Sequence, residues 1–361
     1  MKFKVNRKEL VRILQLVKPL VTTIDFKSIT DSIYMSVKDN ILVVRVVGEE
    51  VIIQANVPVE SDTDMQFLTN AIKLINMITR SDVDTVSFTL QGTNIEEGLG
   101  SVKIKANSQA TLPLRNLNTY PEVIDSEKIV YTKIDESFLD DIMICSKFVD
   151  KKSQNFRSGI NISKNFMIAT NDTSAFFIIR ESPVESFTTK FESFKALYSL
   201  NNIVIGFSEE PLLVLFKGNI EDISVYMAAS IFNEDYPYKD YIKSAKEWRS
   251  SPTYKVKIDK NTLQDTIRRL DGFVTVEYSR IKILVDKNKM VLDYQYQSYE
   301  NEEIIECESE DEFGFSVDIN RLKEILMICS NEIELNVSKD RDIMLLVQDK
   351  QLYCGSIFDR K

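Results

Sequence analysis

The chain has 361 residues, of which 43% are hydrophobic and 28% are charged, and both values are typical of a globular protein. A chain of this length suits two or three hydrophobic cores, because domains usually contain about 100 to 150 residues. Histidine is absent, which excludes a catalytic triad, a histidine general base and the commonest zinc sites. The net charge of −10 argues against a phosphate-binding surface all round the protein, but it leaves room for a local basic surface.

One short phrase, Lys-Val/Ile-Asn/Asp followed four residues later by leucine, occurs three times. The copies begin at Lys4, Lys133 and Lys257, so the repeated units are of domain size. In each copy an alternating strand runs into an amphipathic helix. The asparagine or aspartate lies at this junction, where its side chain is suited to cap the helix by accepting from a free backbone N–H.

Each unit is predicted to contain two helices, about sixty residues apart, with apolar stripes at helical spacing. The stripes of the first helices are Leu10, Ile13, Leu14 and Val17 (ended by Pro19), then Leu139, Ile142 and Met143, then Leu263, Ile267 and Leu270. Those of the second helices are Ala71, Leu74, Ile75 and Ile78, then Phe194, Leu197 and Tyr198, then Leu322, Ile325, Leu326 and Cys329.

Between and after the helices come runs of β-branched and other apolar residues that predict strands. They cover residues 41–47, 203–207, 212–216, 281–285 and 343–347. Tyr120-Pro121 and Tyr236-Pro237 lie near the ends of the first two units and indicate linkers. We therefore predict an α+β protein with three tandem units, 1–125, 126–250 and 251–361, each made of two β-α-β-β-β halves.

Several landmarks occur in the same order as in one known family. They are Met1-Lys2-Phe3, Thr111-Leu112-Pro113, Tyr120-Pro121, the segment from Gly159 to Asp172, Tyr236-Pro237 and the approach from Val317 to Leu326. With three domains of the right size, they make the whole chain resemble a bacterial-type DNA polymerase sliding clamp, the β subunit of the replicase. The resemblance implies a head-to-tail homodimer that closes a ring, with helices lining the hole and sheets outside. It implies a non-enzymatic function, which is to encircle duplex DNA and tether the replicative polymerase for processivity.

The predicted helices carry cations on the side away from their apolar stripes, as a DNA-lined hole requires. The DNA-facing candidates are Lys8, Arg12, Lys73, Arg80, Lys147 and Arg268. For any one of them an ordinary solvated helix face is an equally good interpretation. DNA contacts of this kind would be sequence-independent and weak, and retention would come from ring closure.

The resemblance also implies a hydrophobic pocket for short linear motifs of the polymerase and the clamp loader. Its residues here would be Thr170, Phe176, Pro237, Tyr241, Ile242, Tyr278, Arg321, Cys354, Ser356, Ile357 and Phe358. The dimer interface would include Phe273 from the third domain and Asn107 and Gln109 from the first. The chain departs from the family at Asn171 to Phe176, where the usual His and Arg are lost, at Tyr241 in place of arginine, and in the tail. These departures predict a diverged clamp with altered motif preference, of host or viral origin.

Other function classes find little support. The acidic groups near Glu306 lack the alternating ligands of a calcium loop, and Gly98-Leu99-Gly100 lacks the rest of a phosphate loop. We expect no enzyme activity, no cofactor and no metal, and a cytoplasmic protein without a membrane segment. The four scattered cysteines suit buried positions in a reducing compartment. The main alternative is a repeat scaffold that binds only protein, and a metal-dependent nuclease is the third class considered.

Overall fold

The computed structural model describes the chain except for residues 23–28, 62, 122–128, 172–173, 183, 185, 233–235, 251–252, 276–277, 330, 340–342, 349–350 and 357–361. It contains two compact units. Unit 1 comprises Met1–Glu136 and Glu192–Ile231, and unit 2 comprises Ser137–Phe191 and Phe232–Lys361. Among the described helices, none is both long and apolar enough to cross a membrane.

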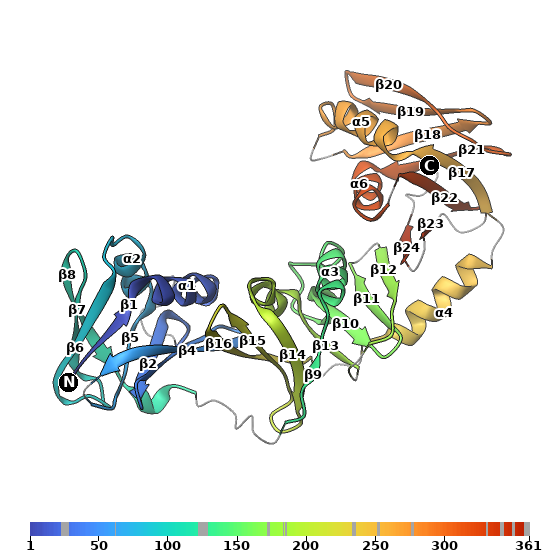
Figure 1. Ribbon diagram of the computed structural model, residues 1–361. Coiled ribbons are helices and arrows are strands. Elements are labelled where there is room, and N and C mark those ends of the chain that lie inside the picture. Colours follow the sequence, from blue (N-terminus) through green and yellow to red (C-terminus); the bar gives the residue numbers. More distant parts are fainter. Residues whose placement is uncertain are drawn as a thin grey trace. The chain divides into compact units, whose positions relative to one another are not determined.

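The first repeat consists of two β-α-β-β-β halves in immediate succession (Figure 1). The first half is β1 (Lys2–Asn6), α1 (Arg7–Val17), β2 (Ser32–Lys38), β3 (Ile41–Val47) and β4 (Val51–Ser61). The second half is β5 (Met65–Asn70), α2 (Ala71–Thr79), β6 (Thr85–Asn94), β7 (Leu99–Lys105) and β8 (Gln109–Arg115). Short 3-10 turns, η1 (Lys18–Leu20), η2 (Ile29–Asp31) and η3 (Leu117–Thr119), lie between them or follow them.

The other two repeats have the same element order. The second is β9 (Thr132–Lys133), α3 (Glu136–Cys145), η4 (Phe156–Ser158), β10 (Gly159–Ser163), β11 (Phe166–Thr170), β12 (Ser174–Ile179), then β13 (Phe187–Lys190), η5 (Phe191–Ser199), β14 (Asn201–Ser208), β15 (Leu213–Ile220) and β16 (Ile223–Ser230). The third is β17 (Thr253–Asp259), α5 (Lys260–Asp271), β18 (Arg280–Asp286), β19 (Lys289–Tyr296), β20 (Tyr299–Glu306), then β21 (Glu312–Asp318), α6 (Ile319–Ile328), β22 (Glu332–Ser338), β23 (Ile343–Gln348) and β24 (Gln351–Ser356). The predicted β-α-β-β-β pattern is confirmed, with a 3-10 helix, η5, in place of one predicted α-helix.

Sheets continue from one repeat into the next. Strand β4 pairs antiparallel with β16, from Val51 opposite Ala229 to Asn56 opposite Ser224. Strand β12 likewise pairs antiparallel with β24. Each compact unit therefore combines one whole repeat with half of the second, because backbone ladders join them. The predicted domain boundaries near 125 and 250 stay a prediction, since the compact units follow these ladders rather than the repeats.

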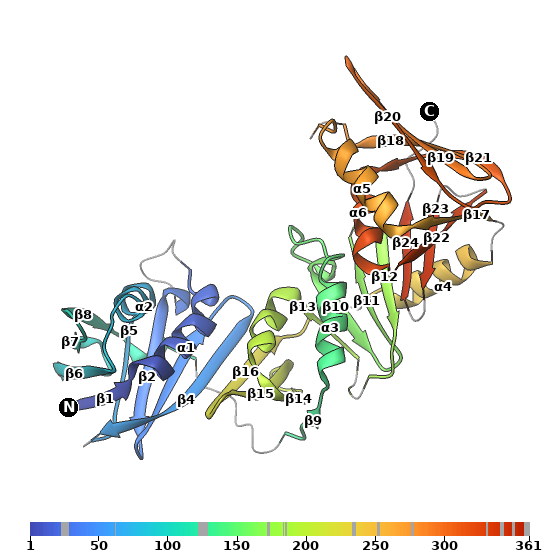
Figure 2. The same ribbon diagram turned by 45° about the horizontal axis from the view of Figure 1, so that its top comes forward.

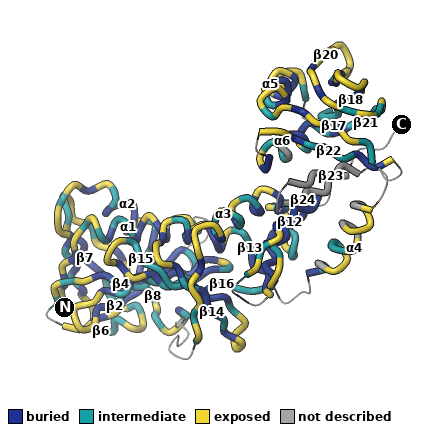
Figure 3. The backbone as a smooth tube through the Cα atoms, turned by 45° about the vertical axis from the view of Figure 1, so that its right-hand side comes forward, coloured by how far each residue is buried: buried dark blue, intermediate teal, exposed yellow. Residues whose placement is uncertain are grey.

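Helices α1 and α2 pack against each other on one face of the first repeat's sheets (Figure 2). Their predicted stripes are buried, and the opposite sides of both helices are exposed (Figure 3). The predicted cap is present at Asn6, whose side chain accepts from the backbone N–H groups of Lys8 and Glu9. Asp259 caps α5 in the same way through Thr262, and these hydrogen bonds lower the pKa of its carboxyl group.

The helix α4 (Tyr238–Arg249) was not predicted. The sequence indicated a linker there, because Pro237 precedes the segment and no apolar stripe runs its whole length. Pro237 instead stands just before the helix, where its missing N–H removes no intrahelical hydrogen bond. The first turn is held by backbone hydrogen bonds from Asp240 and Tyr241 to the Pro237 carbonyl, at 3.2 and 3.3 Å.

Candidate functional site

Exposed cations of α1 and α2 form a basic face on unit 1. Lys8 of α1, Lys73 of α2 and Arg80, the C-cap residue of α2, are all exposed. The apolar stripes of the two helices are buried. The two helices pack against each other with their apolar stripes buried. The cations opposite these stripes therefore lie on one side of the repeat. This face has the charge that a sequence-independent contact with phosphates needs.

Arg12 lies on the same helix but already has an anionic partner. Its guanidinium forms an ion pair with Glu221, which lies in the turn between β15 and β16. The Arg12 side chain is 38% exposed and the Glu221 side chain is 61% exposed. Sequence reasoning missed this pair, because Glu221 comes from the second repeat and only the β4–β16 ladder joins the two repeats in one sheet.

Replacing Glu221 with glutamine is expected to raise DNA affinity about threefold by freeing Arg12 for phosphate. The pair is solvent-exposed, so its loss should change the free energy of unfolding by about 1 kcal/mol or less. Fluorescence anisotropy with a labelled duplex, at several salt concentrations, measures the affinity. Unchanged affinity and salt dependence would mean that Arg12 does not contact DNA.

The remaining predicted cations belong to unit 2. Lys147 follows α3 and is exposed. Arg268 on α5 is also exposed, and it forms an ion pair at 3.3 Å with Asp265 one turn earlier on the same helix. Its neighbour Arg269 pairs with Glu303 of β20 at 2.7 Å.

A second candidate site in unit 2 is a cluster of apolar and aromatic side chains around Tyr236, here called the aromatic cluster. Its buried members are Ile168, Ala175, Phe177 and Tyr236, and the partly buried Phe156, Phe166, Tyr241 and Ile242 pack against them. Two predicted pocket residues, Tyr241 and Ile242, are thus brought together by the first turn of α4. The third predicted residue of this region, Pro237, is partly exposed directly before them.

Phe176 is not part of this cluster, so its prediction as a pocket residue is corrected. Its ring is fully buried and stacks on Phe148, with ring centroids 4.4 Å apart. Successive side chains of a strand point to opposite faces, so Phe176 faces the core while Ala175 and Phe177 face the cluster.

Thr170 and Arg321 meet through Ser174, which the sequence reasoning did not single out. The Thr170 hydroxyl donates to the Ser174 carbonyl at 2.8 Å, and the Arg321 guanidinium donates to the Ser174 hydroxyl at 3.1 Å. Thr170 is buried, and the Arg321 side chain is 12% exposed and ion-paired with Glu324. These polar groups connect the start of β12 with α6.

Other predicted pocket residues lie elsewhere or outside the described part. Tyr278 stacks on Tyr296 of β19, with ring centroids 4.8 Å apart. Cys354 and Ser356 lie on β24, where the backbone of Cys354 pairs with that of Ala175. Ile357 and Phe358 are outside the described residues.

The three predicted interface residues are all exposed. Asn107 lies in the turn before β8, where its side chain accepts from the backbone N–H of Asp82 at 2.6 Å, and Gln109 begins β8. Phe273 follows α5 and is 40% exposed.

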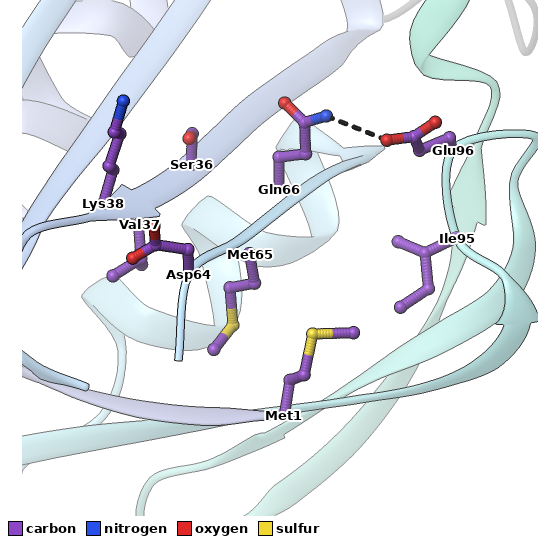
Figure 4. Close-up of a pocket in the computed structure, with 9 residues that line it drawn as sticks. All are labelled: Met1, Ser36, Val37, Lys38, Asp64, Met65, Gln66, Ile95 and Glu96. Carbon is purple, nitrogen blue, oxygen red and sulfur yellow. Dashed lines mark hydrogen bonds between the residues drawn. The ribbon is translucent and has the colours of Figure 1, made fainter. Parts of the chain in front are cut away.

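One further hollow, of about 370 Å³, lies in the first repeat (Figure 4). It is lined by Met1, Ser36, Val37, Lys38, Asp64, Met65, Gln66, Ile95 and Glu96. Gln66 donates to Glu96 at 3.2 Å across its rim. Within the described part of the chain, no three His, Cys, Asp or Glu side chains are grouped so as to hold a metal ion.

Residues 1–124 match the family model of the DNA polymerase III beta subunit, N-terminal domain. No curated protein matches the chain. Solved structures of the DNA polymerase III beta subunit match it from end to end, each covering 100% of both chains. That from Caulobacter crescentus has a TM-score of 0.86 at 14% identity, that from Pseudomonas aeruginosa 0.83 at 15%, and that from Thermotoga maritima 0.83 at 16%. The chain therefore has the fold of bacterial sliding clamps, and the predicted resemblance and α+β fold class are confirmed.

Proposed function

We propose that this chain, whose fold is that of a sliding clamp along its whole length, acts as one: a non-enzymatic ring that encircles duplex DNA and tethers the replicative polymerase. The single observation that carries the proposal is the match of its first 124 residues to the family model within a chain that has the clamp fold throughout. The exposed cations of α1 and α2 provide the sequence-independent DNA contact. We place this function in the cytoplasm, at the replication fork, with three clamp domains at 1–125, 126–250 and 251–361.

The two sheet junctions support a head-to-tail homodimer. In both, the last strand of one repeat's first half pairs with the last strand of the next repeat's second half, as β4 with β16 and β12 with β24. Two strands in equivalent positions form no such junction within the chain: β20, which ends the first half of the third repeat, and β8, which ends the second half of the first repeat. Strand β20 is an edge strand, and β8 pairs with β5 only at Leu114 and Arg115, so residues 109–113 face no further strand within the described part. A junction of β20 with β8 of a second chain would repeat the rule and close a ring.

Charge on the two edges supports the same pairing. Strand β20 exposes Glu300, Glu302 and Glu306, whereas β7, next to β8, carries Lys103 and the exposed Lys105. Opposite charges on β20 and on the strand beside β8 favour one register and one partner. Gln109 begins β8 and Asn107 lies in the turn before it, and we assign both to the first-domain side of the interface and Phe273 to the third-domain side.

Retention by such a ring depends on closure rather than on tight DNA binding. Few phosphate contacts keep the affinity low and salt-sensitive, which permits sliding. A closed ring leaves linear DNA by sliding off an end, while circular DNA holds it until the ring opens.

We assign the partner site to the aromatic cluster and its surroundings. The Pseudomonas aeruginosa clamp has been solved bound to griselimycin, and the Caulobacter crescentus clamp with polyethylene glycol bound to a putative beta-motif tethering region. In this chain the cluster offers the apolar and aromatic lining that a leucine or phenylalanine anchor of a polymerase or clamp-loader peptide needs.

A retention assay tests the proposed function. After loading by the cognate clamp loader, the protein should co-elute with nicked circular plasmid through a sizing column and should be lost when the plasmid is linearised. Equal retention on both forms would refute topological binding. A stable monomer that binds no DNA would instead favour the protein-binding scaffold.

A further inference from the structure

The two Tyr-Pro dipeptides occupy comparable places at the ends of the first and second repeats, but their tyrosine hydroxyls differ in hydrogen bonding. Tyr120 is buried, and its hydroxyl donates to the Arg45 carbonyl at 3.1 Å. Its ring stacks on Tyr34, with centroids 6.0 Å apart. Tyr120 is therefore a satisfied structural residue.

Tyr236 is equally buried, at 5% exposure, but its hydroxyl finds no hydrogen-bond partner in the part of the chain that the structure describes. Its ring lies edge-on to Phe156, with centroids 5.1 Å apart. Burial raises the pKa of this phenol far above its ordinary value, so the group stays protonated and remains a donor at physiological pH. A buried donor without an acceptor destabilises the free protein, which makes an acceptor supplied by a ligand favourable.

Tyr241 is a partly buried neighbour of Tyr236 on a helix rather than on the sheet. The two ring centroids are 6.1 Å apart, and Tyr241 is only partly buried, in the first turn of α4. The adjacent helix residues Lys239, Asp240 and Lys243 are exposed. Rotation of the Tyr241 side chain toward solvent would therefore uncover the cluster without moving the sheet.

We propose that Tyr241 is a gate and that Tyr236 is a ligand-binding residue whose hydroxyl donates to a carbonyl oxygen of the bound peptide. This inference rests on the proposed function of the aromatic cluster as a peptide site. When Tyr241 turns away, an apolar anchor of the peptide takes its place against Ala175 and Phe177. A main-chain carbonyl, or the side-chain carbonyl of Asn or Gln, then accepts from Tyr236.

This arrangement also defines what the site rejects. All eight members of the cluster are apolar or aromatic, so they provide no counter-ion to offset the hydration that a charged anchor would lose. A peptide with apolar anchors but no acceptor near Tyr236 would leave the hydroxyl unsatisfied and bind less tightly. Selectivity thus combines an apolar anchor with one correctly placed carbonyl.

Tyr236→Phe tests the ligand-binding role, and Tyr120→Phe is its matched control. The probe is a fluorescein-labelled nonapeptide with adjacent leucine and phenylalanine anchors, titrated against the full-length protein. Tyr236→Phe should weaken binding about five- to tenfold and leave Tm unchanged or higher, because only an unsatisfied hydroxyl is removed. Tyr120→Phe should lower Tm by about 2 to 4 °C and leave peptide binding unchanged. Unaltered binding by Tyr236→Phe, or a fall in its Tm like that of the control, would overturn the inference.

Tyr241→Ala tests the gate, with Lys243→Ala as the control on the same helix. Removing the gate should raise the association rate of the peptide severalfold, measured by stopped-flow fluorescence, while Lys243→Ala should leave it unchanged. An association rate equal to that of the wild type would refute gating. Failure of the peptide to bind the wild-type protein at all would remove the proposed peptide site itself, whereas binding that ignores both tyrosines would remove only this inference.

Discussion

Replacement of Lys8, Lys73 and Arg80 together by glutamate is expected to impair loading onto DNA and sliding along it while leaving the fold intact. All three side chains are exposed on the α1–α2 face, so reversal of their charge buries nothing and breaks no core contact. Each lost phosphate contact should reduce the slope of log affinity against log salt by about 1, and the affinity at low salt should fall on the order of a hundredfold.

The salt slope, measured with a labelled duplex, and polymerase processivity on a primed circle are the two readouts. A matched control reverses Lys38, Lys164 and Lys289, which are also exposed but lie at strand ends and in a hairpin turn. The control makes the same change in net charge but leaves the α1–α2 face unaltered. It should therefore retain normal processivity. Equal loss in both variants would assign the effect to net charge alone, and no loss in either would contradict a DNA-facing α1–α2 surface.

Glu302→Pro in β20 is expected to convert the proposed dimer to a monomer that still folds. The two-residue turn at Gln297 and Ser298 makes Tyr296 and Tyr299 a hydrogen-bonded pair, and such pairs alternate along an antiparallel ladder. Glu302 is opposite Asp293 in a non-hydrogen-bonded pair, so its N–H points to the open edge. Proline there removes a donor needed by a second chain but none used by β19.

Light scattering after size exclusion measures the result, which should be the mass of one 41.6-kDa chain. Glu302→Gln is the control, because it removes the charge and keeps the N–H, and it should remain dimeric with somewhat weaker association. Circular dichroism should show the same fold for both variants. A dimeric Glu302→Pro protein would show that β20 is not the interface strand.

Most of the secondary structure was predictable because local signals agree with one another. The apolar stripe at Leu10, Ile13, Leu14 and Val17 and the cap at Asn6 both indicate one helix, and the structure has it at Arg7–Val17. The run at 41–47 became strand β3 with the same bounds. Segment η5 kept its buried Phe194 and Leu197 but formed a 3-10 helix, a difference in winding that the spacing of apolar residues did not resolve.

The candidate site was less predictable. Of the residues predicted for the pocket, Tyr241 and Ile242 pack in the aromatic cluster, and Thr170 and Arg321 both bond to Ser174, the neighbour of Ala175. The sequence did not show which face of β12 each phenylalanine is on, because a one-residue shift in a strand exchanges the two faces: Phe176 is in the core and Phe177 is in the aromatic cluster. It also missed α4, whose helical state depends on packing of its first turn against the cluster rather than on a full-length stripe.

The sequence by itself determined the elements, their threefold repetition and the polarity of each helix, because period, caps and turns act within a few residues. Only the tertiary structure decided which distant residues meet. The partly buried ion pair of Asp31 with Arg115, the ion pair of Arg12 with Glu221 and the unsatisfied hydroxyl of Tyr236 all depend on how strands pair and segments pack. Such contacts depend on the register of strand pairing and on the entropy cost of joining distant segments. Neither quantity can be predicted from a local pattern along the chain.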